Sequence, residues 1–481
     1  MFSDTINKSD LLFKGLVASF QDIALQGLGK VASHHSGKIE INLDEASYAI
    51  DTLTMLQEKT VNNLKEEEAR ELNSLIHYLR MNYLDVLKEN QKDSGNSRNS
   101  EDTKPNNTNN TEKKENEMKR TPFYKFHKEM GGKLVPFAGF EMPVQYEGIN
   151  QEHLHVRNKV GVFDVSHMGE FYIKGEDAEK FVSYITCNNP EELGPHGVQY
   201  SAFTMPHSGL VDDLLVYKRS DGFLLVVNAA NIDKDWQWVN KQKDGFKVEL
   251  ENISDKTAQL AIQGPLAEPL TEKLTGLKLT EVPFYESRDF KMYGENVLLS
   301  RTGYTGEDGF ELYFSPEIAD KVWSDLFEAG KEFNLKPIGL GARDSLRLEM
   351  KYCLYGHDID ETTSPLEAGL GWIVKLDKGD FIGKEVLLKQ KDEKPKRKLV
   401  CITMLDKAIP RQHYKILSVI KEDIGEVTSG IMSPSLNKGI ALGYVKTEYS
   451  KIGNKVLIEI RDKHFEAEIV KPPFWKSGSH K

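Results

Sequence analysis

A polar segment near residue 100 divides this chain and limits how it can fold. Between Gln91 and Arg120 the sequence reads QKDSGNSRNSEDTKPNNTNNTEKKENEMKR, and Met118 is its only large apolar residue. Such a composition cannot bury enough apolar surface to offset the conformational entropy of folding. We therefore predict a disordered linker over residues 91–120. A flexible linker of about 30 residues spans roughly 30 Å, so the parts on either side would move independently.

Composition and charge predict a cytoplasmic protein that binds neither membranes nor nucleic acids. Mean hydropathy is -0.49, and without a run of about 18 apolar residues we expect no membrane span. The first residues, MFSDTINKSD, lack the basic and apolar regions of a secretory signal. The three cysteines are too few and too far apart for a disulfide framework or a CxxC metal site. The net charge of -11 argues against broad binding to phosphates.

Residues 1–90 are predicted to form a small all-α module. Apolar residues recur at helical spacing in three stretches, within 11–20, 46–60 and 72–84. Asn42 followed by Glu45 predicts a capping box at the start of the second helix. The segment AIDTLTMLQEKTVNNLKEEEARELNSLIHYLRMNYL resembles a small bacterial family of helical proteins of unknown function. This resemblance implies no chemistry.

Residues 121–481 have the pattern of an α+β protein. Leu214–Ala229 predicts a β-hairpin, and RTGYTGEDGFE predicts a glycine-rich loop between two strands. Ser315 followed by Pro316 predicts a helix start. The last ninety residues have strand-like fragments separated by glycine and proline, so we expect them to be all-β. This alternation of strands with isolated helices favours α+β over a doubly wound sheet.

Several common active-site motifs are missing from the sequence. It contains no GxxxxGK[ST], GxGxxG, GxSxG or HExxH pattern. His153 and His155 are close in sequence, but two alternate residues rarely bind a metal alone, and we expect both at the surface. A nucleotide-triphosphate site, a dinucleotide fold and a zinc site are therefore not predicted.

Three clusters of polar residues remain as candidates for a site. Asp212 and Asp213 precede an apolar strand and would point to opposite faces, so only one can enter a cleft. Tyr304 and Glu311 lie in or beside the glycine-rich loop, where the backbone can approach a ligand closely. Arg343 begins a predicted helix. Taken singly, these residues are more often a solvated pair, a plain hairpin loop and a helix-surface charge.

Taken together, the segments carrying these residues resemble a known enzyme family. The region from Thr121 to about Trp475 resembles the T protein of the glycine cleavage system, the aminomethyltransferase family. The matching segments follow one another in the family's order. They include VGVFDVSHMGE, YSAFTMPHSGLVDDLLVY, SRTGYTGEDGFELYF and GLGARDSLRLEMKYCLYGHDIDETTSPLEAGLGWIV.

The resemblance implies both a fold and a reaction. Three domains would form a cloverleaf around a folate cavity, with folate-binding domains over 121–385 and a β-barrel-like domain over 386–481. The enzyme would take an aminomethyl group from the lipoyl arm of H protein. It would transfer the one-carbon unit to tetrahydrofolate, the co-substrate, and release ammonia. The reaction has no redox step, so no flavin is expected. H protein would deliver the carbon already activated, so no Schiff-base chemistry and no pyridoxal phosphate are expected, and no metal is expected either.

The resemblance also assigns roles to five residues. Glu311 matches the family's glutamate that accepts two hydrogen bonds from the pterin. Tyr200 and Tyr304 match aromatic positions lining the cavity, and Arg343 matches an arginine that contacts the ligand. Asp213 matches the family's key carboxylate beside the folate nitrogens that receive the carbon. The preceding aspartate would point away, so its replacement by asparagine is expected to be mild.

The chain departs from the family at two places, and three alternatives remain. Ser208-Gly209 stands where relatives have Gly-Gly, and the C-terminal tail lacks a tyrosine found in some relatives. The folate-dependent iron–sulfur maintenance family has KGCYxGQE where this chain has KYCLYGHDID. Dimethylglycine and sarcosine dehydrogenases carry a flavin domain, for which this chain has no room. A non-enzymatic folate-binding or regulatory protein would be favoured by loss of Asp213 or Glu311, which are both present.

Overall fold

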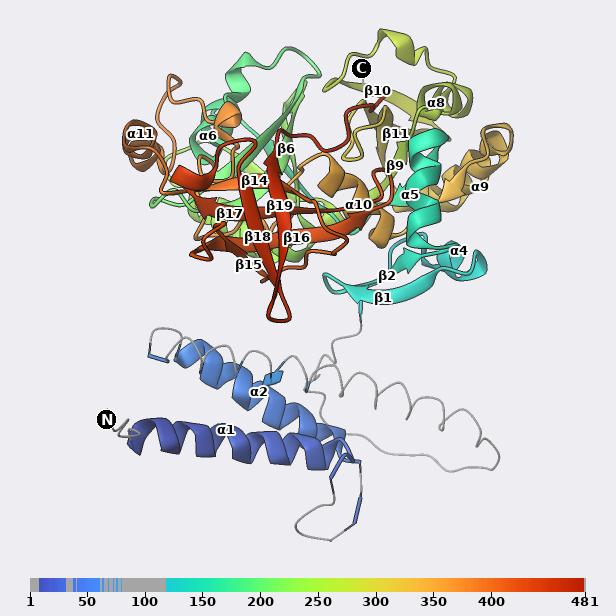
Figure 1. The fold of residues 1–481 in the computed structure, drawn as a ribbon. Coiled ribbons are helices and arrows are strands. Elements are labelled where there is room, and N and C mark those ends of the chain that lie inside the picture. Colours follow the sequence, from blue (N-terminus) through green and yellow to red (C-terminus); the bar gives the residue numbers. More distant parts are fainter. Residues whose placement is uncertain are drawn as a thin grey trace, which may run out of the picture. The chain divides into compact units, whose positions relative to one another are not determined.

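The computed structural model describes residues 8–31, 38–39, 41–60, 63–64, 68, 72, 75–76, 79 and 118–479. The chain divides into two compact units, residues 1–113 and 114–481 (Figure 1). The predicted linker lies outside the described residues except for its last three. Of these, Lys119 pairs with the second unit: its N–H donates to the Gly139 carbonyl (2.9 Å), and its carbonyl accepts from the Glu141 N–H (3.0 Å).

The first unit contains the helices α1 (Lys8–Gly27) and α2 (Leu43–Lys59). The Asn42 side chain accepts from the Glu45 N–H (3.2 Å), which confirms the predicted N-cap. The reciprocal bond of a capping box is not made, because the Asn42 N–H donates to the Gly27 carbonyl (2.8 Å) and the Glu45 carboxylate accepts from the Asn42 side-chain amide instead (3.3 Å). The described residues of the third predicted stretch are helical, while its end at 83–84 lies outside the described residues. The apolar faces of these segments share one core, formed by Ala24, Leu28, Ala46, Ala49, Ile50, Leu53, Leu72, Ile76 and Leu79.

The second unit contains two open sheets built from the same order of elements: a strand, a helix, three antiparallel strands and a second helix before a last strand. The first runs through β4 (Gly169–Lys174), α6 (Ala178–Ile185), β5 (Val198–Thr204), β6 (Leu210–Arg219), β7 (Gly222–Val227), α7 (Ile232–Lys241) and β8 (Glu249–Asn252). The second runs through β9 (Ala258–Gln263), α8 (Ala267–Thr275), β10 (Ser287–Met292), β11 (Glu295–Ser300), β12 (Gly309–Phe314), α9 (Ala319–Gly330) and β13 (Lys336–Pro337). The sequence alone indicates no such repeat.

The two sheets also order their strands alike. The first has the order β5-β6-β7-β4-β8 and the second β10-β11-β12-β9-β3-β13, where β3 is Gly161–Asp164. Each sheet buries one face under its two helices, in cores that include Phe171 and Leu225 for the first and Leu260 and Leu312 for the second. Because strand residues alternate between faces, the neighbouring residues form a second, inner face on each sheet.

The inner faces of the two sheets meet. The hydroxyl groups of Tyr217 on β6 and Tyr313 on β12 are 2.8 Å apart, and both side chains belong to one apolar cluster with Val198, Val226 and Leu298. The hairpin predicted over Leu214–Ala229 is confirmed by β6 and β7, which pair antiparallel. The strands predicted around the glycine-rich loop are confirmed by β11 and β12.

The remaining elements frame these sheets. They are α4 (Tyr124–Glu129), the hairpin β1 (Lys133–Phe137) and β2 (Phe140–Gln145), α5 (Ile149–Asn158), α10 (Leu340–Glu349) and α11 (Lys384–Glu393). The predicted helix start at Ser315 is confirmed, since its side chain accepts from the Glu317 N–H in the short helical turn that leads into α9. Helix α11 runs across the boundary predicted at 385/386, and the domain boundaries stay a prediction.

The C-terminal region is a closed six-stranded barrel in the order β14-β17-β16-β15-β18-β19. Its strands, the reddest in Figure 1, are β14 (Arg397–Met404), β15 (Lys415–Leu417), β16 (Asp423–Ser433), β17 (Lys438–Lys446), β18 (Lys455–Ile460) and β19 (Lys463–Val470). Helix α10 connects it to the sheets, because the Arg347 guanidinium donates to Ser429 of β16 (3.0 Å). The predicted α+β fold with a C-terminal barrel is confirmed.

The prediction of a surface position is wrong for His153. Its side chain is fully buried on α5, with its ring nitrogens 2.7 Å from the hydroxyl groups of Ser345 and Ser435. Its Nε2 also lies 3.2 Å from the Glu349 carboxylate. This histidine therefore joins α5 to α10 and to the loop between two barrel strands, whereas His155 is half-buried.

Candidate active site

The predicted catalytic aspartate lies half-buried on the inner face of the first sheet. Because β5 pairs with β6, Tyr200 stands near Asp213, and its hydroxyl donates to Asp213 Oδ2 (2.9 Å). The side-chain amide of Asn228, just after β7, donates to Asp213 Oδ1 (2.9 Å). One donor thus holds each carboxylate oxygen, which leaves further lone pairs for a ligand.

The electrostatic setting of Asp213 shifts its ionisation to neutral pH. Burial first, and then the negative charge of Asp212, raise the pKa of Asp213 to about 7. The hydrogen bonds from Tyr200 and Asn228 oppose this shift because they favour the charged form. A carboxyl group that titrates near neutral pH is suited to proton transfer or to stabilising developing charge.

Asp212 points to the opposite face, as alternation predicts, but not into solvent. It is fully buried and accepts hydrogen bonds from the Asn228 N–H (3.0 Å), the Asn228 amide (2.9 Å) and the Asn231 amide (2.7 Å). Replacing it with asparagine would turn an acceptor into a donor facing other donors. The expectation of a mild effect is therefore withdrawn, and loss of stability is expected instead.

The turn before these aspartates has an unusual backbone. Ser208 has a φ of 72°, a left-handed conformation that glycine adopts without strain and serine does not. Serine therefore replaces the glycine of relatives at a position that does have positive φ, and its backbone is strained there. At the next residue, a Cβ on Gly209 would stand 1.7 Å from the Glu361 carbonyl oxygen, so only glycine fits there.

Glu311 lies on the inner face of the second sheet and is only 5% exposed. Gln259 on β9 donates its amide to Glu311 Oε1 (3.0 Å), and the Thr302 hydroxyl donates to Oε2. Each oxygen keeps an unused lone pair, so the carboxylate can still accept a pair of donors from a ligand. Burial raises the pKa of Glu311, and the nearby Arg343 charge opposes that rise.

Arg343 and Tyr304 form a second part of this inner-face site. The guanidinium of Arg343, on the first turn of α10, lies 4.6 Å from the centre of the Tyr304 ring. It also donates to His167 Nε2 (2.9 Å). Burial first, and then the Arg343 charge, lower the pKa of His167 to about 3, so this imidazole is neutral and carries its proton on Nδ1.

Several buried polar atoms around this arrangement have no partner. Tyr304 Oη, Gln259 Oε1, His167 Nδ1 and both carboxyl oxygens of Glu170 lack a hydrogen bond among the residues that the structure describes. Buried polar groups in folded proteins are nearly always paired, with protein, water or ligand. Such a group of donors and acceptors around Glu311 fits a polar, flat ligand with both donors and acceptors on its rim.

The sheet geometry relates the two halves of the site. Asp213 is four residues from Tyr217 on β6, roughly 13 Å along the strand, and Glu311 is two residues from Tyr313 on β12, roughly 7 Å. Since Tyr217 and Tyr313 touch, Asp213 and Glu311 lie on facing surfaces of the two sheets. Towards solvent, the Trp372 indole stacks on Tyr200 with ring centres 5.9 Å apart and is 64% exposed.

Sequence reasoning missed four residues of this arrangement: Asn228, Gln259, His167 and Trp372. The motifs VSHMGE and VVNAAN contained two of them, but nothing in the sequence distinguished them from their neighbours. Asn228 lies 15 residues from Asp213, and Gln259 lies 52 residues from Glu311. Only the pairing of strands brings such residues into contact.

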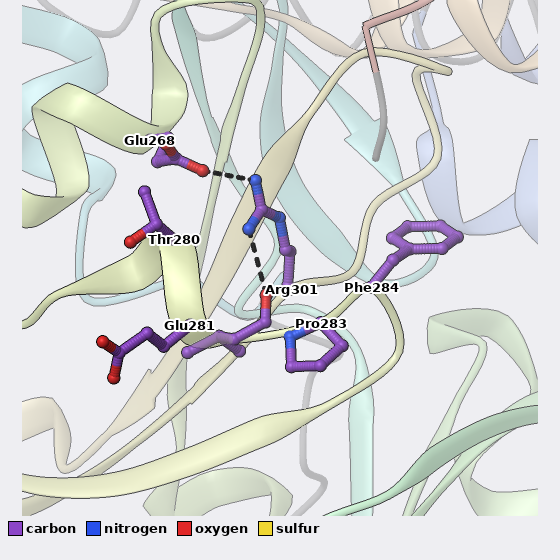
Figure 2. Close-up of a pocket in the computed structure, with 7 residues that line it drawn as sticks. Glu268, Thr280, Glu281, Pro283, Phe284 and Arg301 are labelled. Atoms are coloured by element: carbon purple, nitrogen blue, oxygen red, sulfur yellow. Dashed lines mark hydrogen bonds and ion pairs between the residues drawn. The ribbon is translucent and has the colours of Figure 1, made fainter.

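A separate surface hollow of about 310 Å³ lies near the second sheet and contains none of the predicted site residues (Figure 2). Its one cation, Arg301, is 3% exposed and already held: it donates to Glu268 (2.5 Å), to Asp308 (2.7 Å) and to the carbonyls of Leu279 and Val282. This arginine joins the loops around the hollow and has little capacity left for a ligand.

Within the described ranges, no three His, Cys, Asp or Glu side chains are spaced to hold a metal ion. None of the helices in that part of the chain is both long and apolar enough to span a bilayer.

Comparison with known proteins assigns both units to families. The family described as GCVT N-terminal domain matches residues 123–378, and the glycine cleavage T-protein C-terminal barrel domain matches 397–476. A family described only as a domain of unknown function matches residues 10–85, in agreement with the resemblance of the helical module to an uncharacterised family.

Curated relatives match the second unit over their whole length. Aminomethyltransferases of Bacteroides thetaiotaomicron and Bacteroides fragilis are 52% and 53% identical over 363 residues, which is 75% of this chain and 100% of theirs. The one of Alkaliphilus oremlandii is 48% identical over 367 residues. A crystal structure of the glycine cleavage system aminomethyltransferase T of Bartonella henselae matches with a TM-score of 0.71 and 32% identity, over 76% of this chain and 100% of that one. The chain therefore belongs to the glycine cleavage T-protein family of aminomethyltransferases.

Proposed function

We propose that this protein transfers the one-carbon unit of S-aminomethyldihydrolipoyl H protein to tetrahydrofolate and releases ammonia. The observation that carries the proposal is the full-length match to aminomethyltransferases together with the facing carboxyl groups of Asp213 and Glu311. The products would be methylene-tetrahydrofolate and dihydrolipoyl H protein. By analogy with its bacterial relatives, we place the reaction in the cytoplasm.

The inner-face residues have the chemistry to bind tetrahydrofolate. The pterin ring presents an N–H beside an exocyclic amine, and Glu311 has two unused lone pairs with which to accept both. The unpartnered Tyr304 hydroxyl, Gln259 carbonyl and His167 Nδ1 offer further donors and acceptors to the ring. Arg343 supplies positive charge for an anionic ligand in a chain of net charge -11.

Asp213 would act on the reacting end of the folate. Ionised, it would favour the positive charge that develops when a folate nitrogen attacks the methylene carbon and ammonia departs. Tyr200 and Asn228 hold its two oxygens in place, so the carboxylate needs little reorganisation during the reaction. We assign it an electrostatic and positioning role without a covalent intermediate.

The comparisons with known proteins do not support the alternative functions. The KGCYxGQE motif of the iron–sulfur maintenance family is absent. The relatives that match at about half identity are named aminomethyltransferases. A non-enzymatic folate-binding protein would keep Glu311 but would not need Asp213 with two donors on its carboxylate.

The direct test is ammonia release from aminomethylated H protein, with and without tetrahydrofolate. We expect release that is strongly accelerated by tetrahydrofolate and accompanied by methylene-tetrahydrofolate. Tight folate binding without tetrahydrofolate-dependent release of ammonia would favour the non-enzymatic alternative and overturn the proposal.

Arg343→Ala should weaken tetrahydrofolate binding. The change removes the guanidinium group, which packs against the Tyr304 ring and donates a hydrogen bond to His167. A hydrogen bond to a charged group contributes about 1.5–3 kcal/mol. Titration should therefore give a dissociation constant raised by roughly tenfold or more. Unchanged affinity in the folded fraction, together with a lower melting temperature, would make the arginine purely structural.

A protein that starts at Met118 should keep aminomethyltransferase activity near that of the full chain. This truncation retains Lys119, which pairs with Gly139 and Glu141, and removes the first helical core, which draws all its residues from before position 80. The kinetic constants of both forms would be compared on the same H protein. An insoluble or inactive truncated enzyme would make the helical module part of the same folding unit.

A further inference from the structure

A turn of four residues, 165–168, contacts both ligand-binding parts of the inner-face site. On one side, the Arg343 guanidinium donates to His167 Nε2 (2.9 Å) and lies 3.8 Å from the methionine sulfur at the end of the turn. On the other side, the turn binds the backbone of Gln259, whose side-chain amide donates to Glu311. The position of this turn therefore affects both residues that we expect to bind tetrahydrofolate.

Two hydrogen bonds join the turn to the second sheet. The Val165 N–H donates to the Gln259 carbonyl (3.1 Å), and the Gln259 N–H donates to the Ser166 hydroxyl (3.0 Å). Ser166 and Gln259 are both buried. Because Gln259 is the second residue of β9, a shift of the turn would displace the start of this strand. The amide that holds Glu311 Oε1 (3.0 Å) would move with it.

The carboxylate of Asp164, the last residue of β3, holds the turn in place. Its Oδ1 accepts from the Ser166 N–H (3.0 Å), while its Oδ2 accepts from the Thr121 hydroxyl (2.6 Å) and from His127 Nε2 (2.8 Å). Burial alone would raise the pKa of Asp164, but these hydrogen bonds, that from His127 first, hold it below its usual value. The carboxylate is therefore ionised, and since it can only accept, His127 Nε2 carries a proton.

We propose that Asp164 is a positioning residue for tetrahydrofolate binding. Held by Thr121 and His127, it fixes the turn, and the turn places Arg343 directly and Glu311 through β9. The inference rests on the proposed function for the identity of the ligand. A purely structural Asp164 would contribute to stability without affecting affinity, so the test separates the two.

Asp164→Asn breaks one bond of this set. The asparagine oxygen can still accept from Thr121 and His127, but its amide then faces the Ser166 N–H, and two donors cannot bond. Titration of the folded protein should show a dissociation constant for tetrahydrofolate raised about tenfold or more, because both ligand-binding residues are displaced. At saturating tetrahydrofolate, kcat should stay within about twofold, since Asp213 lies on the other sheet and keeps its own donors.

Thr121→Val and Thr121→Ser form a matched pair. Valine has the shape of threonine without the hydroxyl, whereas serine keeps the donor to Asp164. Valine should weaken tetrahydrofolate binding as Asp164→Asn does, and serine should restore the affinity of the natural protein. An affinity that follows the hydroxyl, whatever the melting temperatures of the two variants, identifies positioning. This pair also carries the test if Asp164→Asn does not fold.

Hydrogen exchange provides a measurement that needs no ligand. The Ser166 amide is bonded to Asp164 Oδ1, so its exchange should be faster in Asp164→Asn, while peptides of the C-terminal barrel keep their natural rates. If the natural protein does not bind tetrahydrofolate, the proposed function fails. The exchange rates then still decide whether Asp164 holds the turn.

Three outcomes would overturn the inference. Natural affinity in Asp164→Asn would mean that the turn does not place the ligand-binding residues. Equal losses of affinity with valine and serine would mean that the shape of Thr121, not its hydroxyl, is needed. Unchanged exchange of the Ser166 amide in Asp164→Asn would mean that this carboxylate does not hold the turn.

Discussion

Asp213→Asn is expected to fold, bind tetrahydrofolate and lose most of its turnover. Loss of a preorganised charge beside the reacting atoms costs on the order of 10²-fold or more in rate. The local geometry accepts the change: the asparagine oxygen can still accept from Asn228, and its amide can donate to Tyr200 in place of the reverse bond. Turnover per folded enzyme and the folate dissociation constant would be measured together. Turnover equal to that of the natural protein would remove Asp213 from catalysis.

The pH dependence of kcat/KM provides a second test of the role of Asp213. Because the pKa of Asp213 is raised to about 7, kcat/KM in the natural protein should rise as pH passes through neutrality and the carboxylate forms. Asp213→Asn should lack this rise.

As pH rises through neutrality, the folding stability of the natural protein should fall while its kcat/KM rises. A folded pKa raised above the unfolded value of about 4 lowers the free energy of unfolding as pH rises from about 4 to 7. The asparagine variant escapes this loss, so its melting temperature at about pH 8 should equal or exceed that of the natural protein. A lower melting temperature there would indicate structural damage as the cause of lost turnover.

Features set by local chemistry or strand periodicity were predictable from the sequence. The cap at Asn42 depends on residues three positions apart. The split between Asp212 and Asp213 follows from the two-residue period of a strand, and the roles of Asp213, Glu311 and Arg343 came from the resemblance. The structure is consistent with those roles, but they remain proposals.

The features that could not be predicted from the sequence depend on tertiary contacts. His153 faces Ser345 and Ser435 only because α10 and the barrel pack on α5. The surroundings of Asp212 depend on α7 folding back over the first sheet, which turns a residue expected to be harmless into part of a buried network. The positive φ of Ser208 is likewise invisible in the sequence, since glycine in relatives only hints at it.

Glu311→Gln should weaken tetrahydrofolate binding more than it slows the chemical step. The protein side can adapt, because the glutamine oxygen can accept from Gln259 while the amide faces the Thr302 hydroxyl, which can also accept. The ligand side cannot, because one of two pterin donors then meets an N–H instead of a lone pair. Losing these charge-assisted bonds costs about 2–4 kcal/mol, which is roughly a thirtyfold to thousandfold rise in the dissociation constant.

Glu307→Gln is the matched control, because Glu307 belongs to the same glycine-rich loop but points elsewhere. Its carboxylate pairs with Arg157 (2.8 Å) and accepts from the Trp475 indole (3.0 Å), so it ties the loop to α5 and the C-terminal tail. This variant should lower the melting temperature and leave folate affinity unchanged in the folded fraction. Glu311→Gln should do the reverse, since its oxygens face the inner surface. Equal losses of affinity in the two variants would show that the loop's shape, rather than the Glu311 carboxylate, determines folate binding.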